Sequence, residues 1–172
     1  SDLFDAIYFS TFFLSPRWQV DGSTSPTSQG SSIIINPNET VVINKKTGAT
    51  PIDIVVAGSV QGVDFQNVFE TGFNFVSTAF PVDGSLDSIF GPTNAAGLDD
   101  GASAADSDNI LVWNGAGFDT FYYSTFFLFP GWQQDGSTTP SSQGATVIAP
   151  IGEGFVVNRK GAPLNFTEVK PF

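Results

Sequence analysis

The stretch YYSTFFLFPGWQQDGSTTPSSQG, residues 122–144, nearly repeats the stretch FSTFFLSPRWQVDGSTSPTSQG, residues 9–30. Each copy joins a run of aromatic residues to a run of Asp, Gly, Ser, Thr and Pro. Aromatic and β-branched side chains favour strands, whereas Gly, Pro, Asn and Asp favour turns. No segment of ten or more residues carries a helical stripe, and only PVDGSLDSIFG (81–91) has room for a helical turn or two. The sequence therefore predicts an all-β fold of β-sandwich or barrel-like modules.

The two copies keep a constant spacing of 114 residues, from Phe12 to Phe126 and from Trp18 to Trp132. A period of this length is the size of a small domain and indicates a tandem duplication. A segment at 63–117 precedes the second copy, and the first copy lacks almost all of a corresponding segment. We therefore predict a truncated module at 1–62 and a complete module at 63–172. In the complete module we expect strands at 72–80, 109–114, 119–129 and 145–150, and at 154–161 a strand that runs into an Asn-basic-basic-Gly turn.

Composition limits the environment and the partners. The chain has 172 residues, of which 41% are hydrophobic, and this is enough for a real core. Its net charge of −11 disfavours nucleic acids and anionic lipid surfaces. Cys and His are absent, which excludes disulfides, thiolate or imidazole metal sites and Ser-His-Asp catalysis. No window reaches the roughly 20 apolar residues of a membrane span.

The start of the chain and its polar composition indicate export. The chain opens at Ser1 without a signal-like apolar run, which is typical of a mature or trimmed chain. It is rich in Ser, Thr and Gly, and it carries two glycosylation sequons, at Asn38 and Asn165. We expect an extracellular or cell-surface location.

Two tryptophans occupy the same repeat position, each after a Pro-x or Pro-Gly step and shortly before Asp-Gly. Trp18 and Trp132 either cap the core with the indole N–H bonded to a backbone carbonyl, or face solvent as stacking platforms for a sugar ring or a partner. Both interpretations stay open from the sequence.

The segment LDDGASAADSDN (98–109) is rich in carboxylates. Asp99, Asp100, Asp106 and Asp108 fall within ten residues, and small side chains between them let the loop curl. Carboxylate oxygens suit Ca²⁺, but the spacing is not that of an EF-hand. The segment is either a solvated acidic loop or a calcium site, and we expect no other cofactor.

Four of the six basic residues fall at one repeat position, as Lys45-Lys46 and Arg159-Lys160. A repeated pair of cations is either ordinary surface solvation or an interface. If it is an interface, the acidic loop of a neighbouring subunit is the complementary partner.

Catalysis is disfavoured although carboxylates are plentiful. A glycosidase needs two carboxyl groups about 5 to 10 Å apart. The repeated carboxylates, such as Asp21 and Asp135, belong to different modules and should lie far apart. We expect that the protein is not an enzyme.

Four motifs of the complete module occur in the same order in one known family. They are Gly-Phe-Asn-Phe-Val-Ser (72–77), an Asp with an aliphatic Trp-Asn strand (108–114), an aromatic strand followed by a Gly and a Trp, and Gly-Phe-x-Val-x-Arg (154–159). In these motifs residues 63–172 resemble a family of uncharacterised exported proteins of verrucomicrobial-type bacteria. The resemblance implies secretion and a β-rich module, and it brings no catalytic signature.

The first copy lacks the segment that precedes the second copy, and this absence suggests how the protein works. A module without its first strands has an open sheet edge, and such an edge is hidden or paired with another chain. A neighbour's strand would fill the gap, and contacts of this kind propagate into filaments. We expect a self-assembling structural protein, a filament, pilus-like fibre or surface-layer subunit, with Phe9 and Phe12 at the interface. A carbohydrate- or calcium-dependent adhesion module and a virion surface protein are the alternatives.

Overall fold

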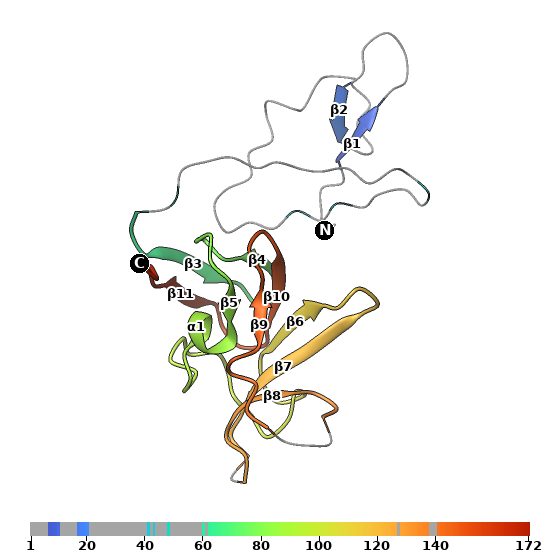
Figure 1. Ribbon diagram of the computed structural model, residues 1–172. Helices are drawn as coiled ribbons and strands as arrows, with labels where there is room; N and C mark the ends of the chain where they lie inside the picture. Colours follow the sequence, from blue (N-terminus) through green and yellow to red (C-terminus); the bar gives the residue numbers. More distant parts are fainter. Residues whose placement is uncertain are drawn as a thin grey trace. The chain divides into compact units, whose positions relative to one another are not determined.

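The computed structural model describes residues 62–126, 128–137 and 141–172, four single residues before them (41, 43, 48 and 60), and the backbone of two short strands at 7–10 and 17–20 (Figure 1). The chain divides into two units, Ser1–Asn36 and Pro37–Phe172. The boundary predicted at 62/63 falls in a stretch where few residues are described, so it stays a prediction. Phe12, Lys45 and Lys46 lie outside the described residues.

The first unit contains one described hairpin, made of β1 (Ile7–Ser10) and β2 (Arg17–Val20). The strands are antiparallel, and Phe9 lies opposite Trp18. Both residues are therefore strand residues, as the aromatic run predicted for Phe9. The sequence placed Trp18 at the edge of a turn, and it lies one residue inside β2 instead.

The second unit is built around an antiparallel five-stranded sheet with the strand order β4-β10-β6-β7-β8. Its strands are β4 (Gly72–Ser77), β6 (Asn109–Trp113), β7 (Phe118–Ser124), β8 (Gly131–Gln134) and β10 (Gly154–Arg159). Two further antiparallel pairs accompany it, β3 (Phe65–Phe69) with β11 (Leu164–Glu168) and β5 (Gly84–Ser85) with β9 (Val147–Ala149). The described part of the chain holds one helix, of five residues, so the all-β prediction is confirmed.

The helix α1 (Leu86–Phe90) lies where the sequence allowed a helical turn, at 81–91. Ser85 begins it with a capping box: the Ser85 hydroxyl accepts from the Ser88 N–H, and the Ser88 hydroxyl accepts from the Ser85 N–H. Gly91 ends it with a φ of 86°, a conformation that favours glycine. The short helix presents three buried side chains to the core, those of Leu86, Ile89 and Phe90.

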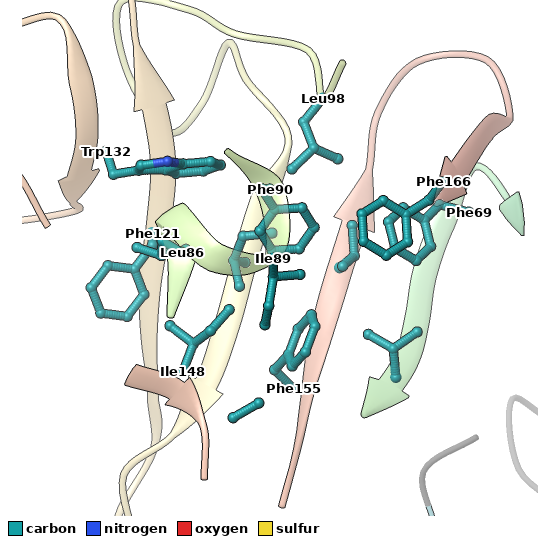
Figure 2. Close-up of a cluster of buried hydrophobic side chains, with 14 residues drawn as sticks. Phe69, Leu86, Ile89, Phe90, Leu98, Phe121, Trp132, Ile148, Phe155 and Phe166 are labelled. Atoms are coloured by element: carbon teal, nitrogen blue, oxygen red, sulfur yellow. The ribbon is translucent and has the colours of Figure 1, made fainter. Parts of the chain in front are cut away.

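One face of the five-stranded sheet carries the core, because successive side chains of a strand point to opposite faces. Figure 2 shows Phe121 of β7, Trp132 of β8 and Phe155 of β10 among the buried side chains of this face, with α1 against them. The β3–β11 pair adds Phe69 and Phe166, whose rings stack at 4.9 Å. Most of the module's aromatic residues that are fully buried thus meet in one cluster, as expected for a strand protein that fills its core with Phe.

The hairpins β1–β2 and β7–β8 have the same register. Adding 114 to each residue number of the first hairpin gives the paired residues of the second, so that Ile7–Val20 becomes Phe121–Gln134 and Phe9–Trp18 becomes Tyr123–Trp132. The repeated sequence therefore forms the same local pairing in both places.

Candidate functional site

Trp132 is part of the core of the second unit. It lies in β8 and is 1% exposed, its indole N–H donates to the carbonyl of Gly91 at 3.0 Å, and its ring packs against Phe90 and Tyr123. Of the two interpretations of this residue, the core cap holds, since a buried ring has no face to offer a sugar. The prediction of Trp132 as an interface residue is corrected accordingly. For Trp18 the side chain is outside the described structure, so both interpretations stay open.

The acidic loop of residues 98–109 is bound to the basic end of β10 in the same chain. The Asp108 side chain is completely buried and Arg159 is 7% exposed, and the two form an ion pair. Asp108 also accepts the backbone N–H groups of Asp99 and Lys160, both at 2.7 Å. Asp99 contacts the same guanidinium nitrogen of Arg159, Nη1, at 3.1 Å.

Lys160 completes this contact from the exposed end of the strand. Its ammonium donates to the carbonyls of Ala104 (2.5 Å) and Ala105 (3.0 Å) in the middle of the loop. The charge complementarity that the sequence suggested between neighbouring subunits therefore exists within one chain. The interface role of Arg159 is corrected, because a buried guanidinium that is already paired cannot bind a second subunit.

The same contacts bear on the calcium prediction. Asp108 gives its oxygens to Arg159 and to two backbone N–H groups, and Asp106 accepts from the Ser103 hydroxyl at 2.8 Å. Asp99 faces Arg159, while Asp100 is exposed. Within the described residues, no three acidic side chains come together as a metal site would require. The loop therefore has a structural role in holding β10 and β6, and calcium binding stays an untested prediction.

Glu168, near the end of β11, is a buried carboxylate that the sequence did not single out. It is 7% exposed, and one of its oxygens accepts the Ala79 N–H at 3.0 Å. Burial raises the pKa of Glu168 above its ordinary value of 4.5, and the bond from Ala79 opposes this in part. The contact joins β11 to the segment after β4.

The second face of the five-stranded sheet, called the outer face here, is unusual in its composition. The registers place fifteen strand residues on it, and none is charged. The two charged residues of these five strands, Asp119 and Arg159, both belong to the core face. Antiparallel sheets commonly present polar side chains on the face that is not packed, and here the polar side chains are all uncharged. The outer-face residues are Phe73, Phe75, Ser77, Asn109, Leu111, Trp113, Phe118, Thr120, Tyr122, Ser124, Gly131, Gln133, Gly154, Val156 and Asn158.

The most exposed part of the outer face is an aromatic pair at the end of the β6–β7 hairpin. Trp113 is 57% exposed and Phe118 is 53% exposed, and their rings meet edge to face at 5.2 Å. Phe73 of the edge strand β4 is half exposed as well. Exposed apolar patches mark interaction sites, so this surface is the candidate functional site. The strand at 109–114 was predicted from the sequence, but its neighbours in the sheet were not.

The comparisons with known proteins give no relative. No family model matches the chain, and neither a curated protein nor a solved structure matches it. The resemblance of residues 63–172 to an exported bacterial family therefore stays a prediction. Among the described residues, no helix is long and apolar enough to span a membrane.

Proposed function

We propose that the protein is a non-catalytic structural protein of the cell surface or extracellular space that associates with copies of itself through the outer face. The observation that supports this is a sheet face without charged residues on a chain of net charge −11. Two copies with this charge repel each other over most of their surface. Two copies that meet through the outer face bring no charged strand residues against each other.

The composition of the outer face supports a packed contact. Trp113, Phe118 and Phe73 supply exposed aromatic area, and aromatic residues are enriched where binding energy concentrates. Two such faces pack as the layers of a β-sandwich do, about 10 Å apart. The acidic loop lies beside this surface, so the contact has an apolar centre and a polar rim.

A face-to-face contact of identical surfaces closes as a dimer, whereas a filament needs a second, different contact. The outer edge of β4 ends the described sheet and is a candidate for that contact by strand addition. The strand complementation of the first unit, with Phe9 and Phe12 at the interface, is the other route to a filament. Both routes are part of the proposal.

Sedimentation velocity over a range of concentrations tests the contact. We expect a concentration-dependent dimer or larger species for the wild type. A double variant, Trp113→Ser with Phe118→Ser, should weaken association about tenfold or more. Ile151→Ser is the matched control, because Ile151 is 61% exposed but lies in the turn between β9 and β10.

Two results would contradict the proposal. One is a wild type that stays monomeric at every concentration. The other is a double variant that associates as strongly as the wild type and the Ile151 control do. Circular dichroism of each variant separates a lost contact from a lost fold.

A further inference from the structure

A small cavity opens on the outer face between β7, β8 and the acidic loop. Its volume is about 100 Å³. This is room for several water molecules or for one small group, but not for a drug-sized ligand, whose pockets measure roughly 300 to 1,000 Å³. The residues that line it are Ala102, Tyr122, Ser124, Phe126, Phe129, Gln133, Gln134 and Ser137.

Gln133 is the unusual member of this lining. It is 7% exposed, and its carboxamide makes no hydrogen bond to any residue in the described part of the chain. A buried polar group without a partner costs free energy, about 1–3 kcal/mol, and native structures contain few of them. A carboxamide offers two donors and one acceptor to whatever enters the cavity.

The neighbours of Gln133 add further polar groups. Tyr122 lies directly opposite it in the sheet. The buried Ser124 hydroxyl accepts the Phe126 N–H at 3.1 Å, which leaves its own O–H to donate. Hydroxyl and carboxamide groups thus converge on the cavity without a charged side chain among them.

Two aromatic rings line the cavity beside its polar groups. Phe126 and Phe129 are each 43% exposed and belong to the connection between β7 and β8. A half-exposed ring beside neutral hydrogen-bonding groups matches a ligand that is apolar on one face and rich in hydroxyl groups at its edge. An anion is disfavoured because the acidic loop contributes Ala102 to the rim and carries four carboxylates.

We propose that this cavity is a binding site for a neutral saccharide, with the edge of one sugar ring at Gln133 and Ser124 and one face of the ring on Phe129. A site of this size contacts only part of the ligand, so a millimolar dissociation constant is expected for a single sugar. The inference does not depend on self-association. Phe129, in the connection that precedes β8, would then have the stacking role that the sequence offered for Trp132.

The test is an NMR titration of the full ¹⁵N-labelled chain with glucose and with N-acetylglucosamine, and glucuronate serves as the charged counterpart. We expect saturable shifts of the Gln133 side-chain amide and of the Ala102 and Phe129 backbone amides with the neutral sugars, and weaker binding of glucuronate. Gln133→Leu should reduce the affinity tenfold or more. Gln66→Leu, at an exposed position of β3, is the control that should bind as the wild type does.

Three results would overturn the proposal. The first is the absence of a saturable shift with either neutral sugar. The second is unchanged binding in Gln133→Leu. The third is a Gln133 amide signal that moves with protein concentration and not with sugar, which would mean that a second copy fills the cavity. If Gln133→Leu does not fold, Phe129→Ser at the exposed rim takes its place and should show the same loss.

Discussion

Replacing Arg159 by Met tests whether the buried ion pair holds the acidic loop. The Asp108 side chain is completely buried, and Arg159 is its only charged partner among the described residues. Methionine keeps most of the apolar stem of Arg159. The Asp108 carboxylate then stays buried without its charged partner, bound to two backbone N–H groups. Removing one partner of a buried pair costs about 3–5 kcal/mol. Because the melting temperature of a chain of this size falls by about 2–4 °C for each kcal/mol, we expect a decrease of about 6–20 °C.

Urea unfolding followed by circular dichroism measures this change in the free energy of unfolding. Lys170→Met removes the same charge from a surface contact, in which the ammonium lies 5.1 Å from the Phe172 ring, and should cost about 1 kcal/mol or less. The double variant Asp108→Asn with Arg159→Met should be more stable than Arg159→Met alone, since it no longer buries an unpaired charge. A loss below about 1 kcal/mol in Arg159→Met, or a double variant no more stable than the single one, would refute the reasoning.

Three further predictions concern pH, the core and salt. Because burial raises the pKa of Glu168, its contribution to stability is greatest below 4.5 and is lost as pH rises through the raised pKa. Glu168→Gln should therefore match the wild type in acid and exceed it at neutral pH in urea unfolding, and parallel curves would contradict this. Trp132→Phe loses the bond to the Gly91 carbonyl and should cost about 1–3 kcal/mol, against about 3–5 kcal/mol for Trp132→Ala; a loss near zero in Trp132→Phe would show that the hydrogen bond contributes nothing. Added NaCl should strengthen self-association measured by sedimentation, because it screens the net charge of −11; weaker association in salt would point to attraction between opposite charges instead.

The strand class and several strand positions followed from local patterns. The strands predicted at 72–80 and 109–114 are β4 and β6, and the helical turn allowed at 81–91 is α1. These features depend on side-chain alternation and on turn chemistry, which are visible within a short window. The sequence placed Trp132 at the edge of a turn because a Pro-x step precedes it and Asp-Gly follows it, and in the structure it is the second residue of β8, after Gly131, which pairs with Ser124.

The sites were harder to predict because they depend on strand order. Nothing local to Asp108 and Arg159 shows that they meet, since 51 residues separate them and the pairing of β6 with β10 brings them together. The same holds for Gln133, whose burial follows from its neighbours on the outer face. The sequence identified the two charged groups as complementary, but it did not distinguish contact within a chain from contact between chains.

The shared register of the hairpins β1–β2 and β7–β8 also has a consequence for folding kinetics. β6 joins the sheet by pairing with β7, and β1 offers a backbone edge with the same local pairing and a closely similar sequence. We therefore expect the two hairpins to compete for the same partner strand during refolding, since misassembly is a characteristic failure of repeat proteins. Only the side chains that differ between the copies, such as Ile7 in place of Phe121, discriminate between the productive pairing and the incorrect one. The refolding yield of the chain should therefore depend on residues that have little effect on the stability of the finished fold.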